Sequence, residues 1–432
     1  MNPLKGFLAG SVLARNTLWM LGGQGVRLSL QAVYFILIAR ALGAQQYGAF
    51  VGAVSLVALI APFCSWGTGF ILIKEVARNR NTFRQYWGAA LGVTVLGGCI
   101  LLCLALTVSH AIWGNSVPLK ALLLVGISDA IVIRILELAV QAFTAVEALR
   151  KCAEINIVLS VTRTLAAICL CFGVRSPSAV SWAFLYLVGA VAATAYAVAA
   201  VTLALGRPSL GLRLSRAELH EGFYFAVSQA SATVYNDVDK TMLVRLGGLE
   251  VTGIYGAAYR IVDVSFAPLS ALVSATAARF FRHGTTGIAG STRFARKLLP
   301  YSAAYGLLAT ASLFLGSSVL PAILGKGFAA TALALRWLSP LVFLRSVHYF
   351  LADSLSTAGH QRRRASVQLG IVGLNVLLNL WLIPIFSWRG AAWASLASDG
   401  ALVLGLFVAI VSIRRDAETS QVTGSVEGRL AS

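Results

Sequence analysis

The sequence predicts an all-α polytopic membrane protein with about twelve transmembrane helices in two six-helix halves. Three observations carry this prediction: the chain of 432 residues is 58% hydrophobic, only 12% of its residues are charged, and its basic residues gather in alternate loops. A soluble globular protein averages about 25% charged residues. A chain this apolar cannot cover a water-exposed surface with polar groups, so a water-soluble enzyme is excluded.

Individual spans follow from the length that a membrane helix needs, which is about 20 predominantly apolar residues. In the first half, the segments that meet this requirement are 16–38, 49–73, 86–108, 120–145, 154–173 and 179–205. In the second half, they are 222–245, 252–278, 298–324, 331–357, 366–387 and 390–413. The connecting loops are short, so the predicted organisation is one six-helix bundle over 1–210, a second over 211–413, and a polar cytoplasmic tail over 414–432.

The loop charges predict the orientation. If the N-terminus is cytoplasmic, the inside segments hold 22 Lys and Arg residues and the outside loops hold six. Cytoplasmic loops of membrane proteins carry an excess of these residues, so we expect both termini in the cytoplasm. The net charge of +19, which would indicate nucleic acid in a soluble protein, is here chiefly a topology signal that also attracts anionic lipid head groups. No nucleic-acid partner is expected.

A short internal repeat relates the two halves. The segments that align at an offset of 205 residues are 39–53, ARALGAQQYGAFVGA, and 244–258, VRLGGLEVTGIYGAA. In this alignment Gly43 matches Gly248, and Gly48 matches Gly253. Both segments lie between the first and second spans of their half, which predicts parallel repeats with a binding site at their interface, an architecture of transporters. The alternative is a glycine-rich tight turn of the kind that many membrane proteins carry after a first helix.

Seven basic and seven acidic residues fall inside the predicted spans when the residues at span ends (Lys120, Glu154 and Arg245) are counted with the loops. Ionisable groups are expensive at this depth and indicate function by default. Three pairs have the i,i+3 spacing that allows neutralisation on one helix face: Arg134 with Glu137, Asp237 with Lys240, and Arg260 with Asp263. Structural neutralisation and a functional role both remain open for these six residues.

The other basic groups in the spans are more informative. Four arginines have no carboxylate three or four positions away: Arg27, Arg163, Arg336 and Arg345. Each must meet an acid on another helix, water in a cavity, or an anionic ligand such as phosphate, whose oxygens suit the planar guanidinium. Arg336 lies close enough to the outer end to snorkel, whereas Arg27 is in mid-span. Asp237 and Asp239 lie two positions apart, so one can pair with Lys240 while the other accepts a proton or sodium ion.

Motifs of enzymes and cofactor sites are absent from the sequence. There is no GxxxxGK[ST] phosphate loop, no HExxH, no CxxC pair and no GxSxG, and the five histidines have no metal-ligand spacing. We therefore expect neither an enzyme nor a bound cofactor.

Three segments carry a resemblance to a known family: residues 40–48 (RALGAQQYG), 235–246 (YNDVDKTMLVRL) and 251–263 (VTGIYGAAYRIVD). They resemble the Wzx-type polysaccharide-export flippases of the multidrug/oligosaccharidyl-lipid/polysaccharide exporter superfamily, over residues 12–413. The resemblance implies two six-helix bundles around a central cavity, in the bacterial cytoplasmic membrane. It also implies translocation of an undecaprenyl-pyrophosphate-linked oligosaccharide to the outer leaflet by alternating access, for cell-surface polysaccharide synthesis, with proton or sodium coupling.

The resemblance also implies roles for particular residues. The cavity cations that would contact pyrophosphate or sugar are Arg27, Arg163, Arg345, Lys240 and Arg260, and the ion-coupling candidates are Asp237 and Asp239. The implied partners are the lipid-linked oligosaccharide, membrane lipids, and the polymerase and assembly proteins of a polysaccharide pathway. Two rival functions remain: a cation-coupled drug or small-molecule exporter of the same superfamily, against which the arginines argue, and a membrane component of a polysaccharide pathway that transports nothing.

Overall fold

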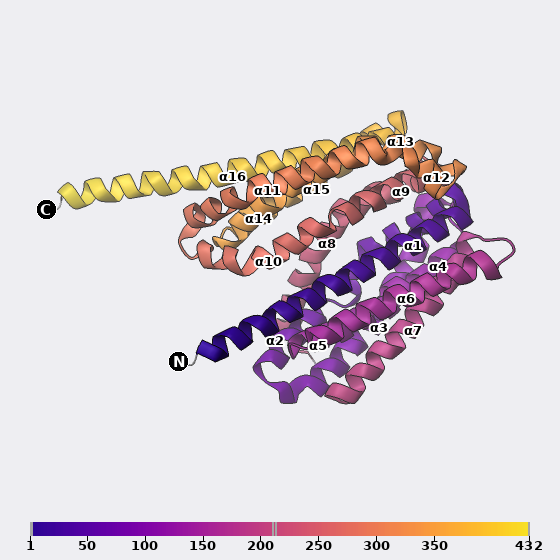
Figure 1. The fold of residues 1–432 in the computed structure, drawn as a ribbon, viewed down its shortest axis with the longest axis horizontal. Helices are drawn as coiled ribbons and strands as arrows, with labels where there is room; N and C mark the ends of the chain where they lie inside the picture. Colours follow the sequence, from indigo (N-terminus) through magenta and orange to yellow (C-terminus); the bar gives the residue numbers. More distant parts are fainter. Residues whose placement is uncertain (1–2, 210, 212–213, 431–432) are drawn as a thin grey trace. The chain divides into compact units, whose positions relative to one another are not determined.

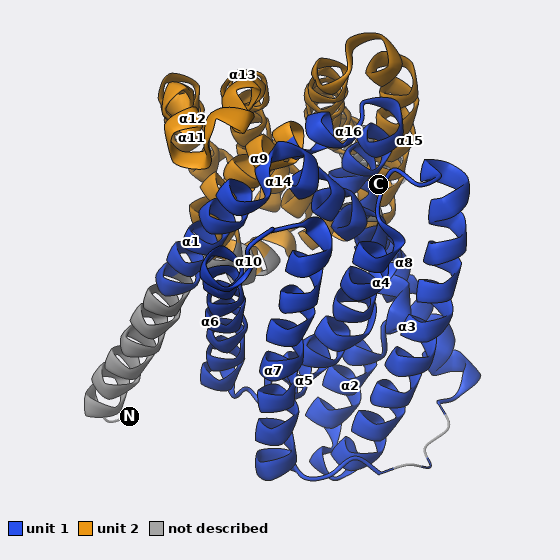
Figure 2. Ribbon diagram, turned by 90° about the vertical axis from the view of Figure 1, so that its right-hand side faces the viewer, with its two compact units in different colours: residues 1–253 blue, residues 254–432 orange. Residues whose placement is uncertain are grey.

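The computed structural model describes the backbone of residues 3–209, 211 and 214–430, and the side chains within these ranges except those of residues 3–24, 231, 232, 274, 275, 277, 278, 281 and 416–430. The described residues form helices joined by short connections, with no strand among them. Figure 2 shows two compact units, unit 1 (residues 1–253) and unit 2 (residues 254–432). Each unit is described by itself below.

Unit 1 contains the helices drawn from indigo to rose in Figure 1. They are α1 (Pro3–Cys64), α2 (Thr68–Arg78), the 3₁₀ turn η1 (Arg80–Thr82), α3 (Phe83–Trp113), α4 (Leu119–Gly126), the π-helical turn η2 (Ile127–Val132), α5 (Ile133–Ala145), α6 (Leu149–Gly173), α7 (Ala179–Leu205), α8 (Arg216–Leu246) and the first turn of α9 (Leu249–Ser265).

Unit 2 begins inside α9 and extends to the C-terminal end of the chain. Its further elements are α10 (Ala267–Gly284), α11 (Gly287–Gly316), the 3₁₀ turn η3 (Ser317–Val319), α12 (Leu320–Leu324), the 3₁₀ turn η4 (Lys326–Phe328), α13 (Ala329–Leu338), α14 (Pro340–Thr357), α15 (Gln361–Phe386) and α16 (Trp388–Leu430).

The helices confirm the predicted polytopic, all-α class. Eight helices among the described residues are long and apolar enough to cross a membrane, and the pair Leu249–Ser265 and Ala267–Val273, bent by 42°, adds a ninth candidate. All twelve predicted spans lie in one helix or in consecutive helices. Two of the twelve, 120–145 and 222–245, do not meet the length-and-apolarity criterion, because each carries several charged residues.

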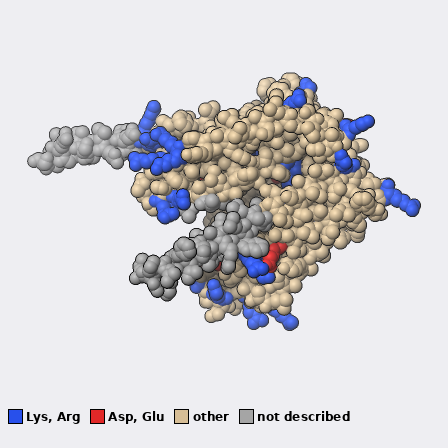
Figure 3. All heavy atoms as spheres, in the orientation of Figure 1, with Lys and Arg blue, Asp and Glu red and all other residues tan. Residues whose placement is uncertain are grey.

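Large apolar side chains are exposed along the helices of both units. Phe172 and Leu203 of unit 1 are 85% and 88% exposed, and Leu315 of unit 2 is 74% exposed. On the face shown in Figure 3, most of the surface is neither basic nor acidic. Continuous apolar exposure of this kind is stable in lipid and costly in water, so the chain is a multi-pass membrane protein.

Helix α8 belongs to unit 1 although it lies beyond the predicted boundary at residue 210. It begins with a capping box between Ser215 and Glu218. Near this end, the Nζ of Lys74 on α2 lies 2.6 Å from Glu221, and the hydroxyl of Tyr86 on α3 donates to Glu218 at 2.7 Å. Burial raises the pKa of Glu218, but the hydrogen bonds from Tyr86 and Ser215 outweigh it, so the pKa lies below its usual value. The division into halves at residue 210 stays a prediction.

The glycines of the repeat share conformations and touch one another. Gly43 interrupts α1 with a φ of 68°, and its match Gly248 has a φ of 87° between α8 and α9. A Cβ on Gly48 would lie 1.8 Å from the carbonyl oxygen of Leu249, and a Cβ on Gly253 would lie 2.0 Å from that of Ala44. The two aligned segments therefore pack backbone to backbone in a reciprocal contact inside unit 1. This reciprocity favours a duplication over an isolated tight turn.

Candidate functional site

Unit 1 contains a buried ionic group that we call the Asp129 cluster, made of Asp129, Arg163 and Tyr186 with Arg134 and Glu137 beside them. Asp129 lies on η2, where the helix widens for one π-helical turn before α5 continues. Such turns are rare and occur frequently at functional sites. The turn places a carboxylate of one helix opposite Arg163 on α6 and Tyr186 on α7.

Tyr186 links the two charges of the Asp129 cluster. Its hydroxyl donates to the Oδ2 of Asp129 at 3.2 Å and accepts from an Nη of Arg163 at 2.6 Å. The guanidinium also lies over the Tyr186 ring, 4.4 Å from its centroid, a favourable cation–π distance. An Nη of Arg163 lies 3.9 Å from the Oδ1 of Asp129, which is longer than a direct hydrogen bond. The carboxylate also accepts from Ser128 at 3.0 Å.

Arg134 completes this cluster from the next turn of the same helix. Its Nη1 lies 2.8 Å from Glu137, which confirms the pairing that their i,i+3 spacing predicts. Its Nε donates to the backbone carbonyl of Asp129 at 3.3 Å, a carbonyl that the π-helical turn leaves accessible. Two guanidinium groups and two carboxylates therefore balance one another within unit 1.

Unit 2 contains a second group, the Asp399 cluster, made of Arg345 and His348 on α14, Tyr259 and Asp263 on α9, and Asp399 on α16. The Nη1 of Arg345 lies 3.1 Å from Asp263, and its Nε lies 3.7 Å from the Oδ2 of Asp399. The other Nη donates to the hydroxyl of Tyr259. The arginine side chain is 8% exposed and that of Asp399 is 1% exposed. Again an arginine contacts a tyrosine and carboxylates from other helices.

The charged segment of α8 forms a third buried group. The Nζ of Lys240 lies 3.0 Å from Asp237, confirming that predicted pair, and 3.6 Å from Asp239. Lys240 and Asp239 are buried, whereas the Asp237 side chain is 28% exposed. Lys240 thus faces both carboxylates, and Asp237 is the more accessible of the two.

The four arginines that have no carboxylate three or four positions away in the sequence differ in their surroundings in the structure. Arg163 and Arg345 meet acids on other helices, the first of the three alternatives. Arg336 donates to Ser317 at 2.8 Å near the end of its span. Arg27 and Arg260 are half-buried on α1 and α9.

Sequence spacing missed three members of these clusters. Tyr186 and His348 lie in no motif, and Tyr259 lies in the segment 251–263 without having been singled out. Arg163 contacts an aspartate 34 positions earlier in the chain. One local signal was present, because Tyr259 and Asp263 have the i,i+4 spacing of one helix face, and both meet Arg345.

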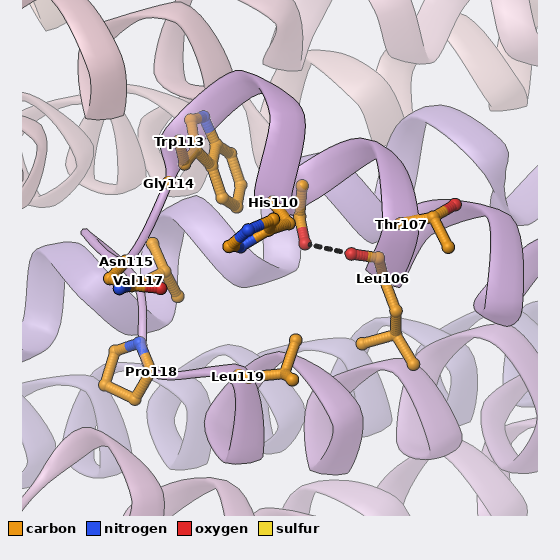
Figure 4. A pocket seen from close by; sticks show the side chains of 10 residues that line it. Leu106, Thr107, His110, Trp113, Gly114, Asn115, Val117, Pro118 and Leu119 are labelled. Atoms are coloured by element: carbon orange, nitrogen blue, oxygen red, sulfur yellow. Dashed lines mark hydrogen bonds between the residues drawn. The ribbon is translucent and has the colours of Figure 1, made fainter.

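A hollow of about 680 Å³ lies elsewhere in unit 1, at the turn between α3 and α4 (Figure 4). Its lining includes His110, Trp113, Asn115 and Pro118. The Trp113 indole is fixed there, since its Nε1 donates to the backbone carbonyl of Thr241 on α8 at 3.1 Å. None of the charged residues described above lines this hollow.

The comparison with protein families finds a match over residues 13–280 to the family described as polysaccharide biosynthesis protein. No curated protein matches the chain significantly in sequence.

Solved structures similar to the chain show a common fold. An inward-facing multidrug resistance MATE family transporter of the MOP superfamily has a TM-score of 0.73 at 12% identity, over 90% of this chain and 96% of that chain. The MATE multidrug transporter DinF-BH in complex with R6G has a TM-score of 0.63 at 18% identity, over 91% and 93%. A MOP superfamily transporter from Pyrococcus furiosus has a TM-score of 0.61 at 12% identity, over 91% and 94%. The chain therefore has the fold of these transporters.

Proposed function

Because the chain belongs to the polysaccharide biosynthesis protein family, we propose that it is a flippase for a lipid-linked oligosaccharide. The cargo would be an undecaprenyl-pyrophosphate-linked repeat unit, moved from the cytoplasmic to the outer leaflet of the bacterial cytoplasmic membrane by alternating access. A pyrophosphate and its sugars cannot cross the hydrocarbon core unaided, whereas the lipid tail can stay in the bilayer. The MOP transporter fold supports this proposal, because it is the fold of proteins that move solutes across membranes.

The observation that carries the proposal is an arginine buried in each unit and contacted by both tyrosine and carboxylate. At membrane depth such groups indicate a substrate or ion pathway. Arg163 lies 3.9 Å from Asp129, and Arg345 lies 3.7 Å from Asp399 and 3.1 Å from Asp263. A pyrophosphate offers more charge and more oxygens than any one of these carboxylates, so it can compete for these guanidinium groups.

We assign the remaining cations and acids to the same cargo path. Arg27, Arg260 and Lys240 would contact sugar or pyrophosphate, with Arg27 and Arg260 half-buried as a contact residue requires. Asp237 and Asp239 would bind the coupling proton or sodium ion. Asp237 is the stronger candidate because its side chain is the more accessible of the two.

A second candidate function is export of a drug or other small cation, as the names of the MATE structures indicate for those proteins. The family match favours the lipid-linked cargo over a drug, because it is to polysaccharide biosynthesis proteins. A third candidate, a component of a polysaccharide pathway that transports nothing, predicts normal translocation when the chain is absent.

Deletion of the gene followed by leaflet-resolved lipid extraction tests the proposal. We expect lipid-linked oligosaccharide to accumulate in the cytoplasmic leaflet, and expression of the wild type or Arg389→Ala to restore its export. Arg345→Ala and Arg27→Ala should fail to restore it. Arg389 is the matched control because it is exposed beside Trp388, 5.6 Å from its ring. Normal polymer in a deletion strain without a second flippase gene contradicts the proposal, and loss of drug resistance alone favours the exporter.

A further inference from the structure

His348 is a buried histidine at membrane depth with no place in the proposed cargo path. It lies on α14, one turn after Arg345, and its residue is 8% exposed. Its Nε2 lies 3.4 Å from the Oδ1 of Asp399 and makes no hydrogen bond. Buried polar atoms are hydrogen-bonded in the great majority of native structures. A histidine nitrogen that faces a carboxylate without a hydrogen bond is therefore a feature that requires an explanation.

Asp399 has a different basic residue at each of its oxygens. Its Oδ1 faces His348 and its Oδ2 faces the Nε of Arg345, at 3.4 and 3.7 Å. Both partners come from one face of α14, because residues three apart on a helix are neighbours. A change in the charge of His348 therefore alters the electrostatic interaction of Arg345 with Asp399, the carboxylate that both residues face.

Other ionisable groups around His348 are contributed by the helices packed on α14. Tyr349 stacks on the imidazole with ring centroids 4.7 Å apart. Further charged or titratable groups on the neighbouring helices include Tyr259, Arg260 and Asp263 on α9, Tyr305 on α11 and Arg364 on α15, with Asp353 on α14 itself. Arg364 lies 3.8 Å from Asp353 and so has a carboxylate of its own.

The charge of the Asp399 cluster depends on His348. With a neutral imidazole, the single positive charge of Arg345 faces the negative charges of Asp263 and Asp399, so the cluster carries one net negative charge. With a protonated imidazole, the cluster is neutral. One proton on His348 therefore decides between the two charge states, and histidine is the residue type that commonly serves as a pH sensor in proteins.

We propose that His348 is a proton-binding site that sets the affinity of Arg345 for the anionic part of the cargo, an inference that rests on the proposed function. A proton from water binds Nε2, and the resulting imidazolium forms a charge-assisted hydrogen bond with Asp399. Asp399 then competes less for Arg345, and a pyrophosphate oxygen takes its place at the guanidinium. Loss of the proton restores the net negative charge and expels the anion. Anion binding and proton binding therefore favour each other, as linkage requires.

Binding of a soluble pyrophosphate lipid to the purified full-length protein tests this inference. The probe is geranyl pyrophosphate, titrated at pH 6 and pH 8, with proton uptake measured by calorimetry in buffers of different ionisation enthalpy. The wild type should bind at least about fivefold more tightly at pH 6 than at pH 8, beyond any change in His348→Gln. Titration of the probe itself is common to all variants, so it cancels in this comparison.

Two further variants show whether the pH dependence comes from His348 and from its charge. His283→Gln is the matched control, because His283 is an exposed histidine of unit 2 that stacks on Phe294; it should retain the wild-type pH dependence. His348→Lys carries a fixed charge and should bind tightly at both pH values. Size-exclusion profiles and melting temperatures establish that each variant is folded.

The outcomes separate the inference from the proposed function. Equal pH dependence and equal proton uptake in the wild type and His348→Gln overturn the inference alone. A wild type that binds no pyrophosphate lipid at either pH overturns the proposed cargo, and the inference with it. Loss of the pH dependence only in the His348 variants supports the inference.

Discussion

Alanine at Gly48 should destabilise the protein, although alanine is the better helix former. Gly48 lies inside α1, so the substitution gains about 1 kcal/mol of helix propensity. The added Cβ would lie 1.8 Å from the Leu249 carbonyl oxygen and 2.8 Å from the Gly253 amide nitrogen. Overpacking typically costs about 1–3 kcal/mol, and the upper end applies because the blocking atoms are backbone. The expected net loss is about 2 kcal/mol.

The measurement is the melting temperature of the purified protein in detergent, followed by fluorescence-detected size exclusion. For a chain of 432 residues, whose entropy of unfolding exceeds that of a small domain, the loss corresponds to a lowering of the melting temperature by about 2–4 °C. Gly92→Ala is the matched control, because Gly92 is exposed inside α3 with nothing within 4 Å of its added Cβ. It should leave the melting temperature unchanged or raise it.

The double variant gives the sharper result. Gly253→Ala alone should cost as much as Gly48→Ala, because its Cβ would lie 2.0 Å from the Ala44 carbonyl oxygen. If the two glycines share one contact, separation of the backbones after the first substitution relieves the second, so the double variant loses less than the sum. Strict additivity, or a Gly48→Ala protein as stable as the wild type, refutes the reciprocal contact.

Three further outcomes are expected. Asp129→Asn should lower stability by about 3 kcal/mol, because it leaves a buried guanidinium without its carboxylate; a thermal shift under 1 °C contradicts this. Lys74→Ala and Glu221→Ala should show a coupling below about 1 kcal/mol in a double-mutant cycle, because the exposed pair is screened by water. The lowered pKa of Glu218 adds stability above the ordinary glutamate pKa of 4.5, which is lost as pH falls through the lower native value; Tyr86→Phe should flatten this acid loss in melts from pH 6 to pH 3.

Apolar run length predicted where the helices are, since a span must bury its own backbone polar groups against lipid. The same rule cannot show that η2 breaks 120–145, because a π-helical turn leaves no pattern in apolar residues. The break in α1 at Gly43 was predictable for a different reason. Gly43 is the residue type that tolerates the positive φ needed there.

Pairs on one helix were predictable and pairs between helices were not. The i,i+3 spacing identified Arg134 with Glu137 and Asp237 with Lys240, both of which are present. It also favoured Arg260 as a partner of Asp263, a carboxylate that lies 3.1 Å from Arg345 on α14. Contacts of this second kind depend on how helices pack, and a single sequence carries no periodic signal for them.

The reciprocal contact of Gly48 with Gly253 has the form of an isologous interface, in which one residue of each copy meets the other copy. In a half-length ancestor that paired with itself, a single codon would have supplied both sides of this contact. After fusion the two codons became independent, yet neither copy gains a side chain without displacing the other. The two halves could thus diverge widely in sequence while the residue at each of these two positions stayed constrained by the residue at the other.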